Sequence, residues 1–576
     1  MGAVRTFTTT VSGAISALCL GSAAAAQGAP PPSLDVTLKP HAEGQAVDYV
    51  DVRLAVQAPD AKPGEAFLRL PMVFASVETA RYHAADITVV DQAGHVPLVQ
   101  KDDPVDPSNF MYFRRWEVSR PTVGDVTVSY RAPAQAYRPK LGSGPPFDLR
   151  PEAGGLNGAG VSFMALPDTS TPYSIHLQWD LADMPAGSRG AWSLGEGEVR
   201  TVGPVDLLAH SYYMAGPMRS YPAPSSGPFA IYWLGEPPFD AQAVAAWTQK
   251  AHTAIAGFFG EPEKPYRVFF RKNPYPGAGG AGLVNSFMSG FSDTPAPTAD
   301  SMRGHLAHEI VHNWTGSLSG PNGIVSWYGE GMAEYYDPVL TWRAGLITTD
   351  EFLNDVNKRA QSYYGNAMNT APASEIAAKF WSDTRVRKLP YDRGSFYLTT
   401  IDAEIRAKSG GKRKLDDLTF AMLNRQKRGL SYDTDAWLEL VTAELGPQAK
   451  LEFEAMMAGK LVVPPTGAFG PCFKRETVPY RIFELGFDSA SLTASPRRVK
   501  GLVPGSAAEK AGVRNGDEIT IAVVLDAIQG DADAELTIHL ERAGQPLEIT
   551  YLPRGKTVEG YRWTRVANVP DTACGI

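Results

Sequence analysis

The sequence predicts a multidomain chain with an N-terminal all-β sandwich, a mostly helical α+β domain and a C-terminal β-rich domain. Short runs that alternate apolar and polar residues fill residues 33–225 and are typical of antiparallel sheets. Longer patterns of helical period dominate residues 229–465, and residues 472–576 return to short strand-like runs. Proline- and glycine-rich breaks separate the three parts, so we expect three domains after a short leader.

The composition fits a globular chain with several cores and does not fit a nucleic-acid binder. Of 576 residues, 44% are hydrophobic, and the length alone suggests about three or four domains. The formal net charge is -8, and no basic run interleaved with aromatic residues is present. A nucleic-acid partner is therefore not expected.

The N-terminus has the pattern of a secretory signal peptide over residues 1–26. Arg5 is its only charge, and a mildly apolar run from Val11 to Leu20 leads to the small residues Ala23 to Ala26. The alternative is a membrane anchor, but the apolar run is about half the length that a span needs. No later segment is long and apolar enough to cross a bilayer, so we expect an exported chain, periplasmic or secreted.

The first domain and its boundaries follow from strand and linker patterns. Residues 46–54 and 126–130 alternate in hydrophobicity, as strands with one buried face do. Residues 220–228, SYPAPSSGP, are interpreted as an inter-domain linker, and a second break follows at residues 463–471.

The next domain contains a motif with the spacing of a metal site, residues 305–314, HLAHEIVHNW. His308 and His312 are four residues apart, so on a helix both imidazoles lie on one face and can share one Zn²⁺. Asp300 or Ser301 can cap the start of this helix and Gly316 can end it. The alternative interpretation is two ordinary histidines on a helix.

A second motif, residues 329–334 with the sequence GEGMAE, offers a third ligand. A Gly/Pro-containing loop, residues 316–323, can join two antiparallel helices and bring Glu330 beside the histidines. Three protein ligands leave a fourth position for water, whose pKa zinc lowers to about 7. Glu334, one turn further, can accept a hydrogen bond from a ligand histidine and fix its tautomer.

Glu309, between the two histidines, is the candidate general base. It points about 100° around the helix from His308, so it is better placed to take a proton from the water than to bind the metal. His305, one turn before His308, is interpreted as a solvated residue or one that supports the site. These residues together predict a zinc hydrolase with one Zn²⁺ per chain.

The same residues resemble the gluzincin peptidases, in which HExxH is followed by a glutamate ligand on a second helix. The closer resemblance is to the glycyl aminopeptidase family, and it covers nearly the whole mature chain. That family combines an N-terminal β domain, a thermolysin-like catalytic domain and a C-terminal PDZ domain. The resemblance implies peptide substrates and a preference for small N-terminal residues such as glycine or alanine.

Tyr391 to Gly394, YDRG, resembles the family's Y-x-K-G segment, with Arg393 in place of the lysine. We expect this segment to open a helix over Ser395 to Ala407. The resemblance implies that Tyr391 donates a hydrogen bond to the oxyanion of the tetrahedral intermediate. The alternative is an aromatic residue that only packs.

Residues 279–286, GGAGLVNS, resemble the strand on which these aminopeptidases bind the substrate backbone. The resemblance implies substrate contacts at Gly282, Leu283, Val284 and Asn285. Val284 stands where the family has the glutamate that holds the substrate's α-ammonium group. Because an unpaired buried charge is costly, this departure leaves exopeptidase and endopeptidase specificity both open.

The C-terminal domain resembles a PDZ domain. Residues 484–487, ELGF, resemble the carboxylate-binding loop with Leu485, Gly486 and Phe487, and residues 501–519 match the bacterial PDZ pattern. Such domains capture peptide C-termini by strand addition; the alternative is a structural cap. Cys472 and Cys574 bracket this domain, either as a disulfide, which export permits, or as two free thiols.

The leading hypothesis is an exported zinc metallopeptidase, aminopeptidase-like. The alternatives are an endopeptidase with the same zinc chemistry and a catalytically silent, PDZ-containing scaffold that binds peptides. The sequence does not decide the physiological substrate or the oligomeric state.

Overall fold

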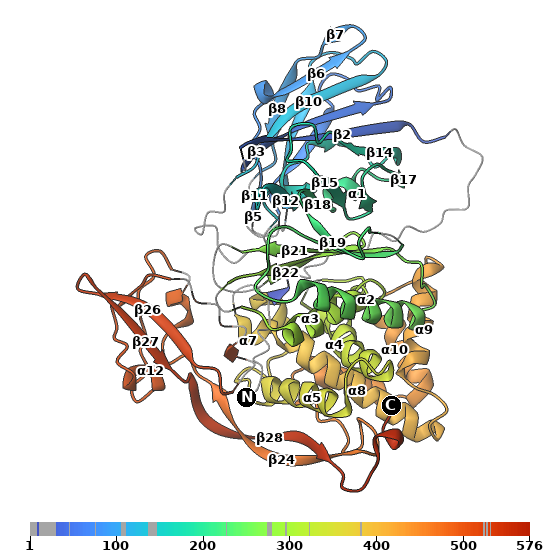
Figure 1. Cartoon of the computed structure of the whole chain (residues 1–576). Helices are drawn as coiled ribbons and strands as arrows, with labels where there is room; N and C mark the ends of the chain where they lie inside the picture. Colours follow the sequence, from blue (N-terminus) through green and yellow to red (C-terminus); the bar gives the residue numbers. More distant parts are fainter. Residues whose placement is uncertain are drawn as a thin grey trace. The chain divides into compact units, whose positions relative to one another are not determined.

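The computed structural model describes two compact units. The β-rich unit comprises residues 9–249 and 262–299, and the helical unit comprises residues 250–261 and 300–576 (Figure 1). The description covers every residue except 1–8, 11–29, 45, 75–76, 105–110, 136–146, 226, 274–278, 294–295, 322, 381–382, 493, 522, 524, 526–527 and 530–531.

The predicted signal peptide lies outside the described residues, apart from the two-residue strand β1 (Thr9–Thr10). Among the helices that are described, none is both long and apolar enough to cross a membrane.

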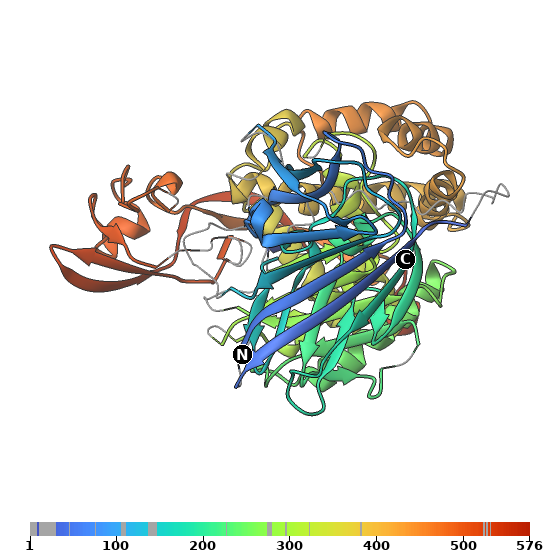
Figure 2. The same cartoon turned by 90° about the horizontal axis from the view of Figure 1, so that it is seen from above.

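Two sheets of the β-rich unit form the predicted β-sandwich. The seven-stranded sheet has the order β17-β14-β2-β3-β10-β6-β7, and the other sheet has the order β13-β4-β9-β8, with β5 also paired to β4. Alternate residues of both sheets fill one core, as in Leu34, Val36 and Leu38 on one sheet and Leu68 and Leu70 on the other. The long strands β2 and β3 run side by side in Figure 2 and pair antiparallel along their length.

The strands of these two sheets are β2 (Ser33–Glu43), β3 (Ala46–Val56), β4 (Ala66–Phe74), β5 (Val77–Glu78), β6 (Ile87–Asp91), β7 (Gly94–His95), β8 (Leu98–Asp102), β9 (Met111–Val118), β10 (Val126–Pro133), β13 (Leu166–Pro167), β14 (Tyr173–Trp179) and β17 (Val199–Gly203).

A third sheet links the sandwich core to a fourth sheet within the same unit. On β18 (Tyr212–Gly216), Tyr213 packs in the sandwich core, whereas its neighbours Tyr212 and Met214 pack in a second core. This alternation is the two-residue period of a strand that is buried on both faces. The second core also contains Phe269 and Met288 of the fourth sheet.

The third sheet has the order β11-β12-β18-β15-β16, and the fourth has the order β1-β22-β23-β21-β20-β19. Their remaining strands are β11 (Arg150–Glu152), β12 (Gly155–Ala159), β15 (Arg189–Trp192), β16 (Gly195–Glu196), β19 (Arg219–Tyr221), β20 (Phe229–Trp233), β21 (Tyr266–Lys272), β22 (Gly279–Leu283) and β23 (Ser286–Phe291), with the short helix α1 (Asp206–Ala209) before β18.

The interpretation of residues 220–228 as an inter-domain linker is wrong. Its first two residues, Ser220 and Tyr221, belong to strand β19, and β20 begins directly after it; the two strands pair antiparallel, with Tyr221 opposite Ile231. The rest of the segment therefore connects the two strands of a hairpin within one sheet. Its Pro, Ser and Gly residues suit a long hairpin loop as well as they suit a linker.

Helix α4 (Ser326–Arg343) is the centre of the helical unit. Nearly all its side chains as far as Thr341 are buried, and it crosses α8 (Leu389–Ser409) closely at a glycine pair. A Cβ atom added at Gly331 would lie 2.7 Å from the backbone carbon of Gly394, so neither position has room for a side chain. This contact brings the two sequence motifs that contain these glycines together.

Helix α8 begins six residues before the predicted start at Ser395. Pro390 lies in its first turn, where proline needs no hydrogen-bonded N–H group. The YDRG motif therefore lies inside the first turns of the helix rather than before it. Gly394 is explained by the close helix crossing and not by a helix boundary.

The other helices of this unit are α3 (Ala299–Val311), α5 (Thr349–Tyr364), α6 (Ala373–Lys379), α7 (Thr384–Arg387), α9 (Leu415–Lys427), α10 (Thr434–Leu445) and α11 (Gln448–Met457). Helix α2 (Ala241–Phe258) contributes residues 250–258 to this unit.

The C-terminal part of the helical unit is a small β-rich module with its own core, joined to α5 by a two-stranded ribbon. The ribbon consists of β24 (Phe473–Phe483) and β28 (Arg554–Arg565), drawn in red shades in Figure 1. The side-chain amide of Asn357 on α5 donates to Trp563 O and accepts from Trp563 N, both at 2.8 Å. Cys472 and Cys574 form a disulfide at the base of the ribbon, with Cα atoms 5.3 Å apart.

The module's elements are β25 (Glu518–Ile519), β26 (Leu536–Arg542) and β27 (Gln545–Tyr551), which form one antiparallel sheet, together with α12 (Ala507–Lys510) and a 3-10 helix at Ser489–Leu492.

Candidate metal centre

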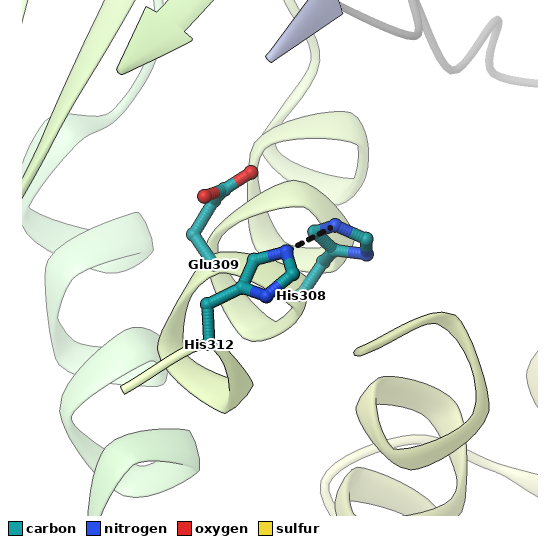
Figure 3. Close-up of side chains that lie close together, drawn as sticks. All are labelled: His308, Glu309 and His312. Carbon is teal, nitrogen blue, oxygen red and sulfur yellow. Dashed lines mark hydrogen bonds between the residues drawn. The ribbon is translucent and has the colours of Figure 1, made fainter. Parts of the chain in front are cut away.

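Helix α3 presents the two histidines of the HExxH motif together. The Nε2 atoms of His308 and His312 lie 3.1 Å apart (Figure 3). The helix ends at Val311, five residues before the predicted end at Gly316, so His312 directly follows its last residue. The side chain of His308 is 6% exposed and that of His312 is 19% exposed, so the pair is open to solvent on the His312 side.

Helix α4 adds Glu330 to this pair. Its Oε2 atom lies 3.5 Å from Nε2 of His308 and 3.3 Å from Nε2 of His312. A tetrahedral zinc ion with bonds of about 2.0–2.1 Å requires ligand atoms about 3.3 Å apart. The three atoms therefore form a triangle of the size and chemistry that zinc requires, and these residues fit the ion.

The charges of the three groups also fit a cation. Burial alone would lower the pKa of His308, but the carboxylates of Glu330 and Glu334 beside its two ring nitrogens raise it well above its ordinary value. Burial would raise the pKa of Glu330, but the charge of His312 and the contacts with both imidazoles hold it below its ordinary value. The pocket is thus rich in negative charge that a bound cation would neutralise.

Glu309 lies beside the triangle and is buried, with 2% of its surface exposed. One of its carboxylate oxygens and one ring nitrogen from each histidine all lie within 4.8 Å of one another. In Figure 3 its side chain leaves the helix in a different direction from the two rings. A carboxylate in this position can reach a water molecule at the open position of the site without replacing a ligand.

Glu334 is in contact with the other nitrogen of His308. Its Oε1 atom lies 3.4 Å from His308 Nδ1, and its Oε2 atom accepts hydrogen bonds from Arg359 on α5. Burial and the charge of Glu334 raise the pKa of the neighbouring Asp337 well above its ordinary value. His305 is half-buried rather than solvated, and burial lowers its pKa to about 3.

Tyr391, in the first turn of α8, lies against the same histidine. The rings of Tyr391 and His308 are nearly parallel, with centroids 6.0 Å apart. The ammonium group of Lys388, one turn earlier, lies 5.5 Å from the centre of the Tyr391 ring. A cation in this position makes the phenol a stronger hydrogen-bond donor.

Arg393, which stands where the resembled Y-x-K-G motif has a lysine, is buried and holds a loop. Its Nη2 atom donates to the carbonyl oxygens of Asn369 and Ala371, at 2.9 Å and 2.8 Å. These bonds stabilise the backbone before α6 and explain why an arginine suits this position.

The residues predicted to bind substrate lie on the β-rich unit, at the end of β22 and in the turn after it. Gly282 and Leu283 are the last residues of β22, which pairs antiparallel with β23. Val284 N donates to His210 O at 2.9 Å, and Asn285 has a φ of 45°, as a tight turn requires. The valine side chain offers no charge to a substrate amine.

The predicted carboxylate loop lies in the C-terminal module. Leu485 and Phe487 are buried in the module core, and Gly486 has a φ of 86°. The residues after the loop form the 3-10 helix at Ser489–Leu492.

Sequence reasoning missed Arg359 and Lys388. Lys388 is three residues before Tyr391, so helical spacing could have suggested it. Arg359 is 25 residues from Glu334, and no spacing rule connects them.

Three comparisons bear on this site. Residues 301–400, which include the three candidate ligands, Glu309 and Tyr391, match the profile of the M61 glycyl aminopeptidase family. No curated protein matches the chain. Among solved structures, the chain is similar to an aminopeptidase N family protein from Idiomarina loihiensis, with 17% identity, 92% of this chain and 98% of that chain covered, and a TM-score of 0.63. An M1 zinc metallopeptidase from Deinococcus radiodurans shares 18% identity over 76% of this chain and 97% of its own, with a TM-score of 0.46.

The similarity to the Idiomarina protein shows a shared fold: a multidomain chain with N-terminal β-sandwich-like sheets and a helical domain. The family profile covers the segment in which the zinc-sized triangle lies. That segment is therefore the catalytic segment of a zinc peptidase, and its cofactor is a catalytic zinc ion.

Proposed function

We propose that the chain is an exported zinc metallopeptidase that removes small residues from the N-termini of peptides. The observation that carries the proposal is the triangle of His308, His312 and Glu330, with edges of 3.1, 3.3 and 3.5 Å, beside the buried Glu309. Within residues 301–400, the glycyl aminopeptidase profile supports the same reading.

The protein's own residues divide the chemistry between them. Zinc, when bound by His308, His312 and Glu330, supplies a water that is acidic enough to react near neutral pH. Glu309 takes the proton of the attacking water and delivers it to the nitrogen of the leaving amine. Tyr391 donates its O–H to the oxygen of the attacked carbonyl as negative charge develops there.

The exopeptidase part of the proposal depends on how the substrate's amine is bound. Val284 cannot pair with an α-ammonium group, so an aminopeptidase requires another carboxylate for this task. The alternative is an endopeptidase, which uses the same zinc chemistry and needs no such group. Val284 is the specific observation that favours it.

The test is a digest of a mixed peptide library by the mature chain, with free and acetylated N-termini in parallel. We expect only peptides with a free amine to be cut, with release of N-terminal glycine or alanine, and activity to stop when a chelator removes zinc. Equal cleavage of acetylated peptides would establish the endopeptidase, and peptide binding without any cleavage would establish the silent scaffold.

Export and the domain limits belong to the same proposal. Residues 1–26 would be the signal peptide, residues 33–225 the N-terminal β-sandwich domain, residues 229–465 the catalytic domain and residues 472–576 a PDZ domain; the boundary after residue 225 would then fall in the β19–β20 hairpin and not in a linker. Cleavage after export would be visible as a mature N-terminus near residue 27 and as enzyme outside the cytoplasm.

For the PDZ domain we propose the role of a structural cap rather than the capture of peptide C-termini. A 3-10 helix, and not a strand, follows the loop at Leu485 to Phe487, and strand addition needs an exposed strand edge. The ribbon of the module also packs on α5 through Asn357 and Trp563. Micromolar binding of peptides with free C-termini to the module would contradict this role.

A further inference from the structure

Arg359 makes a short charged contact beside the metal centre. Its Nε and Nη2 atoms both donate to Oε2 of Glu334, at 2.9 Å and 2.6 Å, and each side chain is 9% exposed. Nη2 also lies 3.9 Å from Asp337. A buried carboxylate needs a compensating cation, and Arg359 supplies it with two donors in one plane.

The other oxygen of Glu334 faces the metal centre. Oε1 lies 3.4 Å from His308 Nδ1, while Nε2 of the same ring faces His312 and Glu330. A proton on Nδ1 directed at Glu334 leaves the Nε2 lone pair free for a cation. The contacts thus link Arg359 to Glu334, and Glu334 to Nδ1 of His308, the ring nitrogen that does not belong to the triangle.

Helix α5, which carries Arg359, is also held from a second direction. Asn357 is two residues earlier, so it points about 200° around the helix from Arg359. Its amide closes two hydrogen bonds of 2.8 Å with the backbone of Trp563 on the ribbon. The ribbon therefore holds the helix that carries Arg359, and Glu334 holds its guanidinium group.

We propose that Arg359 is a positioning residue of the zinc centre, which sets the orientation and proton of His308 through Glu334. The inference rests on the zinc site of the proposed function, but it concerns affinity for the metal and not the choice of substrate. It assigns a task to a residue that lies outside both metal-binding motifs.

The test measures zinc affinity by competition with a chelating dye, in the full mature chain. Arg359→Met should weaken zinc binding by about 10- to 100-fold and lower kcat while KM stays unchanged. Arg359→Lys should recover part of the affinity, because it keeps the charge but not the two-point contact. The control is Arg406→Met, since Arg406 pairs with buried Asp402 on α8; it should lower thermal stability and leave zinc affinity unchanged.

A double variant separates positioning from general destabilisation. If Arg359 acts through Glu334, Arg359→Met combined with Glu334→Gln should bind zinc about as weakly as Glu334→Gln alone. Fully additive losses, wild-type affinity in Arg359→Met, or an equal loss in the Arg406→Met control would each overturn the proposal. If Arg359→Met does not fold, Arg359→Lys replaces it in the test. A partial loss of zinc affinity in Arg359→Lys that does not add to the loss in Glu334→Gln would support the proposal, and full additivity would overturn it.

The readout also separates this proposal from the proposed function. Zinc affinity that depends on Arg359, in a chain that cuts no peptide, would refute the peptidase and support the positioning role. Peptide cleavage by a chain whose zinc affinity does not change in Arg359→Met would support the peptidase and refute the positioning role.

Discussion

The α3–α4 region and the α5–α8 region contribute to the metal centre in different ways. The first supplies the polar atoms of the zinc-sized triangle, all within 3.5 Å of one another. The second supplies support: a buried ion pair from α5 and a glycine crossing with α8. The difference teaches that ligand identity and ligand orientation are set in separate parts of the unit. Loss of a ligand in the first region should abolish function outright, and changes to the supporting contacts of the second should weaken it by degrees.

Loss of a ligand should have the largest effect. His312→Ala removes one corner of the triangle, so bound zinc should fall from about one per chain to nearly none, and activity with it. Metal analysis of the purified protein measures this, and far-UV circular dichroism checks that the fold survives. Zinc retained at one per chain would show that His312 is not a ligand.

Glu309→Gln should separate chemistry from metal binding. Because Glu309 stands beside the triangle and is not one of its corners, zinc should be retained while kcat falls on the order of 10³-fold. Steady-state kinetics on a glycyl or alanyl peptide, with metal analysis of the same sample, gives both values. Near-normal kcat would transfer the general-base role to another group.

Tyr391→Phe tests the α8 side of the centre with the loss of a single oxygen. We expect kcat to fall on the order of 10²-fold with KM and zinc content unchanged, since the O–H acts on charge that develops in the transition state. A change in KM alone would indicate that the ring packs against the substrate and donates nothing to it.

The glycine crossing should give the smallest effect, and α4 provides its own control. Gly331→Ala places a methyl group 2.7 Å from Gly394 and should destabilise the fold by about 1–3 kcal/mol. Gly329→Ala, on the other side of Glu330, meets its nearest atom at 3.5 Å and should be neutral or stabilising by up to about 1 kcal/mol. Thermal unfolding midpoints of the two variants measure this difference. Equal midpoints would mean that α8 moves away from the added methyl group at no cost in stability.

The parts of the centre that local spacing controls could be predicted from the sequence. His308 and His312 share a helix face by periodicity, and a short loop between two helices returns Glu330 to them. Arg359 could not be predicted, because its contact with Glu334 depends on how α5 packs against α4. The segment at residues 220–228 was misread because hairpin loops and linkers use the same turn residues.

The start of α8 was predicted too late. The YDRG motif was expected to open a helix at Ser395, yet α8 begins at Leu389 and runs through Gly394, where the neighbouring backbone leaves no room for a side chain. Close approach between two helices depends on residues more than 60 positions apart, which no local pattern records.

The packing of the β24–β28 ribbon on α5 has a consequence for fragments of this protein. A fragment that stops at residue 465 would lose the aromatic partners of Tyr364 and Phe396, whose rings lie 5.3 Å and 5.9 Å from those of Tyr561 and Trp563. The bare aromatic surface should make such a truncated product aggregate, whereas the same chain carried through to Cys574 and produced in an oxidising host should remain dispersed.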